Sequence, residues 1–510
     1  MRTLVVLMLL AVPITAGAQQ LPPHANLPLD HWTMPYLEHL VARQVVVDPT
    51  PLVRPWTVGA IGRAVAAADT TQLSVADRAT LAMLRGALLP EATDLTLTAG
   101  ADAGVRAATH ARRTAFDLRP AGPGDVVPVG GFTLGLQFGP ALVLMHPVWL
   151  GNLYDDPDIG ATKQPVRGRF AEAYVAYRSR LFDVDFGNVS RNWGPTMFPG
   201  LLFSNWTPSI DHLYLRFGPP AISLVLVAAQ LDRMVNLDGD LSNRYFYAGR
   251  LQVRPARWID LAAWQGTIAS GPNRSFDLWF LNPFKTTFQS RDEHQQAANV
   301  WLGGDGELRL GRFTLDGSLT IDDIQLFKSG GPGDQEPPSY AGSATVATHA
   351  GPVGLRLGYT RVSNLMYRTN DPSESPITGV NPGRDRFGTG LARNFSDYEQ
   401  ATFLATFVPL PGVLLEPEIT WLRQGEGDFR LPFPTAAEYA TTPTIFAGIV
   451  ERTWRAALRA SVHVPLDLTI EGDAGVHFLA NAQHVQGAKQ TDFVGSLIVR
   501  FGVSRLWGLQ

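Results

Sequence analysis

The sequence predicts an all-β transmembrane fold, an antiparallel β-barrel of about 18 strands, preceded by a small α-helical module. Three observations support this prediction. The chain begins like an exported protein and has no later apolar run long enough for a spanning helix. From about residue 94 onward, apolar residues recur at every second position. The connections between these strand-like segments are alternately short and long.

Composition narrows the classes of function. The 510 residues include 46 acidic and 42 basic ones, giving a formal net charge of −4. This balance argues against nucleic acid as a partner, because a phosphate-binding surface needs a basic excess. The chain has no cysteine, which excludes disulfides, zinc–thiolate sites, iron–sulfur clusters and a cysteine nucleophile.

Residues 1–18 are interpreted as a secretory signal, with a charged start, an apolar run from Leu4 to Val12, and an Ala-x-Ala cleavage site ending at Ala18. Residues 19–93 then show helical periodicity and predict a module of about three short helices. We expect Asp30 to cap the first helix, Arg54-Pro55-Trp56 to open the second, and Ser74 to Asp77 to form a capping box for the third.

Residues 94–510 are predicted to form the barrel. In the first strand, for example, residues Leu95, Leu97 and Ala99 alternate with polar or small residues, which places one row of side chains on each face. About eight short turns and about nine long loops connect the segments, so about 18 strands follow. A soluble β-sandwich or propeller is the alternative, but it predicts no such alternation of loop lengths.

In a membrane barrel the apolar row faces lipid and the polar row faces a bore that holds water unless something fills it. We expect the charged residues of the inner row to pair across strands: Asp183, Asp185, Arg250, Arg254, Asp316, Asp322, Arg356, Glu416, Glu418, Arg455, Arg459, Glu471, Asp473 and Arg500. Tryptophans near strand ends are expected to form the interfacial girdle: Trp258, Trp301, Trp421 and Trp454.

The long loops are where a ligand site is expected. The segment from Gly187 to Pro195 places asparagine, serine and arginine beside tryptophan, a combination that suits carbohydrate because indole rings stack on sugars and polar groups meet hydroxyls. The alternative is a lid folded into the bore, with Arg191 paired to Asp183 or Asp185. A second aromatic loop allows the same two interpretations; it contains Phe276, Trp279, Phe280, Phe284 and Phe288.

The sequence does not favour catalysis. It contains neither H-E-x-x-H nor G-x-S-x-G, and the adjacent pairs Asp211-His212 and Glu293-His294 would point to opposite faces of a strand. A spatial Ser-His-acid triad is the alternative. A turn holding Asn236, Asp238 and Asp240 is interpreted as solvated rather than as a calcium loop. We therefore predict no catalytic residues, no metal site and no cofactor.

The stretch from Asp185 to Trp206, DFGNVSRNWGPTMFPGLLFSNW, resembles the Wzi capsule-assembly family of outer-membrane proteins in its glycine, Arg-x-Trp-Gly-Pro and downstream Ser-Asn elements. The helical region, with Trp32, Tyr36 and the step Arg54-Pro55, and the overall layout are also similar. The resemblance implies an eighteen-stranded barrel with a periplasmic helical bundle and a lectin-like role in attaching capsular polysaccharide. The residues that match the motif are the candidate ligand-binding residues: Arg191, Asn192, Trp193 and Trp206. The chain departs from common barrels in lacking a terminal aromatic residue, so Phe501 or Trp507 would have to serve as that signal.

The sequence therefore predicts a non-enzymatic outer-membrane protein, with its helical module in the periplasm, that binds capsular or other surface polysaccharide and supports capsule assembly. The alternative is a porin-like channel for saccharides or small solutes. The expected partners are polysaccharide and outer-membrane lipid, without nucleic acid, and the expected oligomeric state is a monomer.

Overall fold

The structure, a computed structural model, describes residues 20–71, 73–90, 93–110, 124–151, 166–294, 297–323, 335–378, 389–464 and 467–509. The predicted secretory signal, residues 1–18, lies outside these ranges. None of the helices in them is long and apolar enough to cross a membrane.

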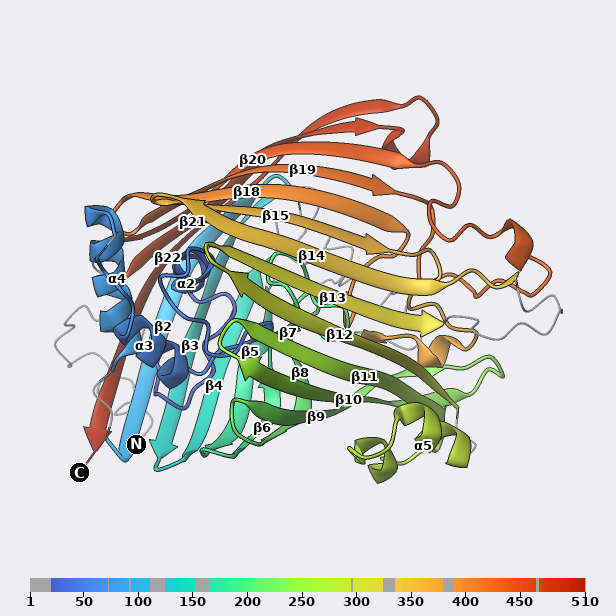
Figure 1. The fold of residues 1–510 in the computed structure, drawn as a ribbon, viewed down its shortest axis with the longest axis horizontal. Helices are drawn as coiled ribbons and strands as arrows, with labels where there is room; N and C mark the ends of the chain where they lie inside the picture. Colours follow the sequence, from blue (N-terminus) through green and yellow to red (C-terminus); the bar gives the residue numbers. More distant parts are fainter. Residues whose placement is uncertain are drawn as a thin grey trace.

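Eighteen antiparallel strands form one closed barrel (Figure 1), which confirms the predicted fold class. The last strand pairs with the first along its length, from Leu95 opposite Leu509 to Ala108 opposite Ser496. The first nine strands are β2 (Leu95–Ala108), β3 (Asp125–Phe138), β4 (Ala141–Gly151), β5 (Val166–Arg178), β6 (Phe182–Val189), β8 (Ile210–Phe217), β9 (Ile222–Val235), β10 (Leu241–Ala256) and β11 (Ile259–Pro272). The other nine are β12 (Ala298–Leu310), β13 (Phe313–Asp323), β14 (Ser339–Ala350), β15 (Val353–Val362), β18 (Tyr398–Leu410), β19 (Val413–Gln424), β20 (Glu451–Val464), β21 (Leu468–Ala480) and β22 (Lys489–Leu509).

The two ends of the barrel differ in their connections. Turns such as 139–140 and 351–352 join strands at one end, whereas the other end carries long segments such as 190–209 and 363–397. This asymmetry is typical of outer-membrane barrels, whose short turns face the periplasm. The helices before β2 lie at the short-turn end (Figure 1).

Three helices precede the barrel: α2 (Met34–Ala42), α3 (Val58–Ala66) and α4 (Val75–Leu88). The Ser74 hydroxyl accepts a hydrogen bond from the Asp77 backbone N–H at 3.0 Å, so the expected cap of the third helix is confirmed. Two details of the prediction were wrong. The N-cap of α2 is Thr33 rather than Asp30, and α3 begins only at Val58, because Thr57 caps it through the Ala60 N–H.

The helices are packed into the short-turn end of the barrel. The Tyr36 hydroxyl donates to the carbonyl oxygens of Gly412 at 2.8 Å and Ser461 at 2.9 Å, and the Trp32 ring stacks on the ring of His463 at 3.7 Å. Between α2 and α4, Arg43 Nη1 lies 2.9 Å from Asp77 Oδ2. Burial alone would raise the pKa of Asp77, but hydrogen bonds from His39, Arg43 and Ser74 hold that pKa at about 2.

The two faces of the wall follow the alternation in the sequence. Large apolar side chains are exposed on the outside, for example Leu251, Leu357 and Phe403. Many of the charged inner residues pair across strands as expected, because a buried charge needs a partner. Arg455 Nη1 lies 2.5 Å from Glu418 Oε1, and its other terminal nitrogen contacts Asp473.

The expected tryptophan girdle holds only in part. Trp258 and Trp454 are more than half exposed, in keeping with an interfacial position. Trp301, by contrast, is fully buried and belongs to an apolar cluster with Trp264 and Phe246. The prediction for Trp301 was therefore wrong, because its alternation places it on the inner face, where other parts of the chain cover it.

Candidate functional site

The motif 185–206 begins with an ion-pair network inside the barrel. Asp185, at the inner face of β6, is 1% exposed and accepts hydrogen bonds from Arg178 and, at 2.5 Å, from Arg191 Nη2. The Arg191 guanidinium also donates through Nε to His212 Nε2 at 2.7 Å and lies 3.8 Å from the centroid of the Tyr214 ring. The pairing of Arg191 with Asp185, which the lid alternative predicted, is confirmed.

The next two residues, Asn192 and Trp193, form the short strand β7 (Asn192–Trp193). This strand pairs with β1 (Val53–Arg54) of the helical region. The Asn192 side-chain oxygen accepts the Gly200 N–H at 2.7 Å, and a Cβ on Gly200 would lie 2.4 Å from the Trp193 carbonyl oxygen, so only glycine fits this turn. The motif therefore joins the helices to the inside of the wall.

The end of the motif is joined to a second long loop. The Ser204 N–H donates to the Leu391 carbonyl at 2.9 Å, and the Ser204 hydroxyl donates to the Ala392 carbonyl at 2.5 Å. Trp206, which is half-buried, meets the Phe395 ring edge-on at 6.5 Å between centroids. The loop 190–209 thus packs against residues 391–395 of the second loop.

The structure therefore brings the four predicted ligand-binding residues into one inward-folded region. Arg191, Asn192 and Trp193 are each at most 5% exposed, and their contacts described above are internal. Direct contact of these residues with a ligand stays a prediction.

This inward-folded region fills the bore at its level, and we refer to it as the plug. Its apolar core is buried against inner wall residues, which include Phe246, Trp264 and Trp301. The plug residues of this core include Leu201, Leu202, Phe203, Leu365, Met366, Tyr367, Leu391, Ala392 and Phe429. The expected bore holds water only where nothing fills it, and at this level loops that carry apolar side chains occupy the space.

One buried arginine holds the plug to the wall. Arg244 on β10 is 0% exposed and donates to the carbonyl oxygens of Ser373 at 2.6 Å and Ile377 at 3.1 Å. It also contacts the Ser375 carbonyl, and its Nη1 reaches the Asp232 carbonyl at 3.1 Å. Because a guanidinium has five fixed donors, this single side chain binds several parts of one loop in a defined geometry.

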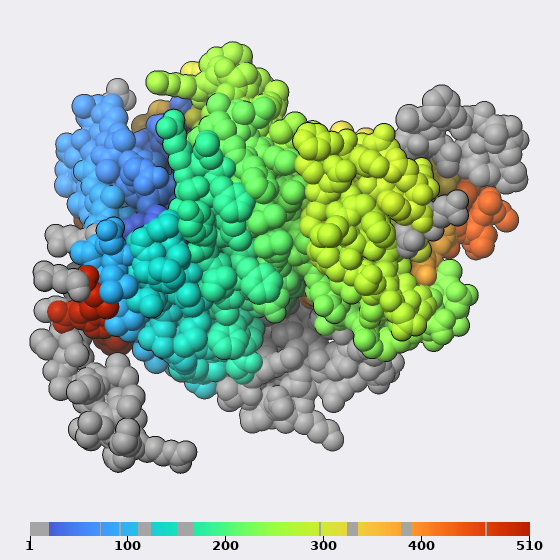
Figure 2. Space-filling model, turned by 90° about the horizontal axis from the view of Figure 1, so that it is seen from below, coloured from blue at the N-terminus to red at the C-terminus, as the bar shows by residue number. Residues whose placement is uncertain are grey.

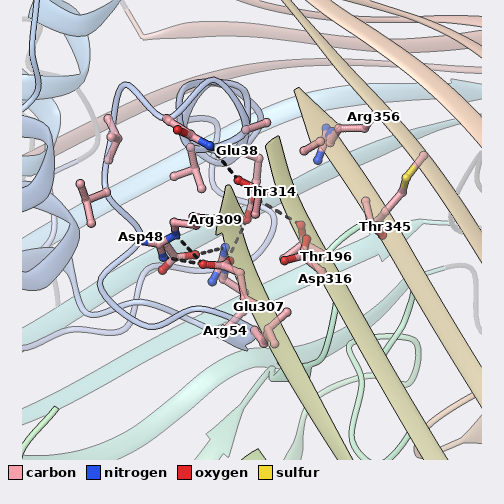
Figure 3. Close-up of a pocket in the computed structure, with 18 residues that line it drawn as sticks. Glu38, Asp48, Arg54, Thr196, Glu307, Arg309, Thr314, Asp316, Thr345 and Arg356 are labelled. Atoms are coloured by element: carbon pink, nitrogen blue, oxygen red, sulfur yellow. Dashed lines mark hydrogen bonds and ion pairs between the residues drawn. The ribbon is translucent and has the colours of Figure 1, made fainter. Parts of the chain in front are cut away.

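A small pocket of about 200 Å³ lies between α2, the segment after it and strands β12 to β15 (Figure 3). Five of its charged groups pair with one another. Arg54 donates to Glu38 Oε1 and to Asp48 Oδ2, both at 2.8 Å, and Arg309 donates to Glu307 Oε1 at 2.6 Å. These pairs lie within the helical region or within β12, and the Gln44 amide, which donates to Thr314 Oγ1 at 3.2 Å, attaches the helical region to the wall here.

The long-loop end carries a larger and more open cavity of about 630 Å³, which we name the outer cleft. Its volume is in the range of sites that hold small molecules. The segments around it come from four connections and three strand ends. Its lining side chains are Phe288, Arg291, Ala298, Asn299, Val300, Leu302, Ile321, Asp322, Asp323, Glu336, Ser339, Arg368, Thr369, Asn370, Glu374, Phe433 and Tyr439.

Three aromatic rings and two guanidinium groups line the outer cleft. Phe433 and Tyr439 meet edge-to-face with centroids 6.4 Å apart, and the Arg291 guanidinium lies 5.1 Å from the centroid of the Phe288 ring. All three rings are partly exposed. Ring faces beside carboxylate, amide and guanidinium groups can stack on an apolar sugar face and hydrogen-bond its hydroxyls.

The carboxyl of Glu374 is an outer-cleft group that its surroundings affect strongly. It lies on the short helix η3 (Pro372–Glu374) of loop 363–397. Burial and the nearby Asp371 raise the pKa of Glu374 to about 7, against a smaller opposing effect of Arg274 and Arg291. Near neutral pH this carboxyl can therefore either donate or accept a hydrogen bond.

The side chains of both histidine–acid pairs are engaged separately; Asp211-His212 lies on β8 as predicted, whereas Glu293-His294 lies on helix α5 (Thr287–His294) and not on a strand. His212 is buried beside Arg191, whereas Asp211 is exposed. His294 stacks on Trp279 at 4.2 Å, and Glu293 pairs with Lys285. Within the described ranges, no group of three or more histidine, aspartate or glutamate side chains could hold a metal ion.

Sequence reasoning singled out Phe288 in the outer cleft but missed Phe433, Tyr439 and Arg368. Phe433 and Tyr439 share the connection between β19 and β20, but Arg368 and Phe288 lie on two other long loops, so no spacing within one segment relates the whole set. The available signal was the position of aromatic and arginine residues in long loops predicted at the same end of the barrel.

Comparison with known proteins supports the same family that the motif suggested. Residues 93–302 match the family model described as capsule assembly protein Wzi. A search of curated protein sequences finds no match.

Among solved structures, the chain resembles Wzi of Escherichia coli, described as an outer-membrane protein involved in group 1 capsule assembly and a carbohydrate-binding β-barrel. The two are 14% identical with a TM-score of 0.59, and the match covers 93% of this chain and 98% of that one. A more distant structure is the outer-membrane protein OpdK of Pseudomonas aeruginosa, at 12% identity, a TM-score of 0.44, and coverage of 81% and 99%.

The match to the E. coli structure shows a similar fold. The match to the family model is a match of sequence, and its range, 93–302, includes the motif from Asp185 to Trp206. Over residues 93–302 the chain therefore matches the Wzi capsule-assembly family, and its fold is similar to that of the E. coli outer-membrane barrel.

Proposed function

We propose that this protein binds exported polysaccharide in the outer cleft and thereby supports capsule assembly, without catalysing a reaction. The observation that carries the proposal is the outer cleft itself: a cavity of about 630 Å³ at the long-loop end, lined by partly exposed rings and by charged groups of both signs. The family's description as capsule assembly proteins points in the same direction.

The composition of the outer cleft suits a flexible, hydroxyl-rich chain. Phe288 offers a ring from the connection between β11 and β12, and Phe433 and Tyr439 offer rings from the connection between β19 and β20, so neighbouring sugar units of one polymer could meet rings on two sides of the outer cleft. Arg291 and Arg368 add donors suited to the carboxylate or phosphate groups that many polymers carry. Binding by several modest contacts along a chain gives retention through multivalency rather than through one tight pocket.

The filled bore favours a binding protein over the channel alternative. A solute would have to cross the buried apolar core of the plug, which Arg244 holds to the wall. It would then meet the helices packed into the short-turn end. We therefore assign the helical region, residues 19–93, the role of a periplasmic closure of the barrel, and residues 94–510 the role of the barrel itself.

The direct test is retention of purified surface polysaccharide by the intact protein immobilised in detergent. We expect the wild-type protein to retain polymer and Tyr439→Ala to retain at least several-fold less. Tyr177→Ala is the matched control, because Tyr177 is exposed on the barrel wall in β5. Absence of retention by the intact protein, or equal loss in both variants, would contradict the proposed site.

Planar-bilayer recording distinguishes the proposed binding protein from the channel alternative. The plugged barrel is expected to give no steady single-channel steps at moderate voltage. Long-lived open channels in the wild-type protein would favour a transport function instead.

A further inference from the structure

The connection between β11 and β12 folds down over the outside of the barrel. Phe280, in the short helix η1 (Leu278–Leu281), packs against Tyr245 and Tyr247 of β10. Phe246, between these two tyrosines, belongs to the inner core. Because side chains alternate across a strand, Tyr245 and Tyr247 point outward, so Phe280 lies on the outer surface of the wall.

The same connection reaches the middle of the wall. Gln265 lies halfway along β11 and shares the outer face with its cross-strand partner Leu302, which is 38% exposed. The Gln265 side-chain oxygen accepts the Thr287 N–H at 3.0 Å, and its amide nitrogen donates to the Lys285 carbonyl at 3.4 Å. An uncovered amide would face hydrocarbon at this depth without a partner, so the connection covers a polar part of an otherwise lipid-facing surface.

The side of this connection that faces away from the wall is apolar and exposed. Phe284 is 94% exposed, Leu278 is 72% exposed and Phe276 is 43% exposed. In Figure 2 the yellow-green part of the chain stands on the face of the molecule toward the viewer, to the right of the centre. Exposed apolar side chains of the neighbouring wall continue the same surface: Leu251, Leu261 and Leu302.

We propose that residues 276–288 form a lipid shelf, in which Phe276, Leu278 and Phe284 insert among the acyl chains of the outer leaflet. We identify lipid as the partner of the shelf because the shelf extends the wall surface that faces lipid in an outer-membrane barrel. Charge is consistent with this assignment: Lys285 pairs with Glu293, and Arg291 pairs with Asp292. The segment thus presents apolar surface rather than a net charge for an acidic partner.

The lipid shelf has a consequence for the neighbouring site. The helix α5 (Thr287–His294) begins within the last residues of the shelf, and its residues Phe288 and Arg291 line the outer cleft. Lipid contact on one side would therefore hold one wall of the outer cleft at the membrane surface. This consequence rests on the proposed function, whereas the lipid contact itself does not.

The absence of cysteine makes a site-specific test direct, since one introduced cysteine carries the only label. A nitroxide spin label is attached to Phe284→Cys and, in a second variant, to Leu278→Cys. The full chain is reconstituted in phosphatidylethanolamine and phosphatidylglycerol vesicles, with and without lipid A. Leu237→Cys is the control, because Leu237 is 68% exposed in the loop 236–240 at the tip of β9 and β10.

Collision of the label with oxygen, which concentrates in lipid, is compared with collision with a water-soluble nickel chelate. We expect oxygen to dominate at positions 284 and 278 and the chelate to dominate at position 237. Chelate-dominated relaxation at 284 and 278 would overturn the proposal. Spin–spin broadening that disappears on dilution with unlabelled protein would identify a second copy as the occupant and would overturn it as well. None of these outcomes depends on polysaccharide binding, so failure of the shelf and failure of the proposed function are distinguishable.

Discussion

The motif 185–206 and the outer cleft use similar residue types in opposite surroundings. In the motif, Arg191 and Trp193 are at most 3% exposed, and Arg191 forms an ion pair with Asp185. In the outer cleft, Arg291 and Tyr439 line an open cavity. Arginine beside an aromatic ring is therefore no sign of a ligand by itself, because the same pair also closes a barrel from within.

Solvent accessibility therefore distinguishes side chains with a structural role from side chains that are available to bind a ligand. A buried guanidinium paired with a buried carboxylate stabilises only while both partners are present. A partly exposed ring loses little when it is truncated, apart from what it binds. The two regions should therefore respond to mutation in different measurements.

The largest effect is expected for Arg191→Ala. It leaves Asp185 with one of its two arginine partners and His212 without its donor, so the free energy of unfolding should fall by about 3 to 5 kcal/mol. Thermal unfolding in detergent measures the change. Arg180→Ala, at an exposed turn position, should lie within roughly 0.5 kcal/mol of wild type; equal losses in the two variants would refute the structural role of Arg191.

The next effect is expected for Arg244→Ala, which leaves buried carbonyls of loop 363–397 without their donor. Removing a charged donor from such groups costs about 1.5 to 3 kcal/mol each, so the plug should loosen while the wall stays closed. Planar-bilayer recording should then show intermittent channel openings absent from the wild-type protein and from Arg233→Ala, an exposed β9 control. A variant as silent as wild type would show that the plug does not depend on this arginine.

A moderate effect is expected for the ring pair of the outer cleft. Phe433→Ala and Tyr439→Ala should each weaken polysaccharide binding about tenfold, or about 1.4 kcal/mol. Because the rings touch each other, the double variant should lose less than the product of the two single effects. Equilibrium binding to labelled polymer measures this, and strict additivity would mean that the rings act at separate positions.

The smallest effect concerns pH. The pKa of Glu374 is raised to about 7 in the folded protein, so the folded state binds this proton more tightly than the unfolded state does. Its stabilising contribution is complete below the ordinary pKa of 4.5 and is lost as pH rises from there through about 7. The melting temperature should therefore fall over this range in the wild-type protein and fall less in Glu374→Gln; an unchanged slope in the variant would assign the pH effect to other groups.

The barrel was predictable because its signals are local. Alternation along single strands, as in Leu95 to Ala99, and the lengths of connections both lie in short stretches of sequence. The capping of α4 by Ser74 was predictable for the same reason. Even the pairing of Arg191 with Asp185 involves residues only six positions apart.

The outer cleft and the burial of Trp301 were not predictable in this way. The cleft joins Phe288 to Tyr439 across six of the eighteen barrel strands in sequence order, and loops of unlike length place them together. Trp301 follows the strand period correctly, but its role depends on the inward fold of distant loops, which residue spacing does not encode.

The most direct test compares two variants in the same two assays: Arg191→Ala and the double variant Phe433→Ala/Tyr439→Ala, each measured for thermal unfolding and for polysaccharide binding by the folded fraction. The outer-cleft variant is expected to lose binding with an unchanged melting temperature. Arg191→Ala is expected to melt at lower temperature, with binding by its remaining folded protein retained. If the folded Arg191→Ala protein fails to bind while the outer-cleft variant binds normally, the polysaccharide site lies in the motif 185–206, and the outer cleft is not the binding site.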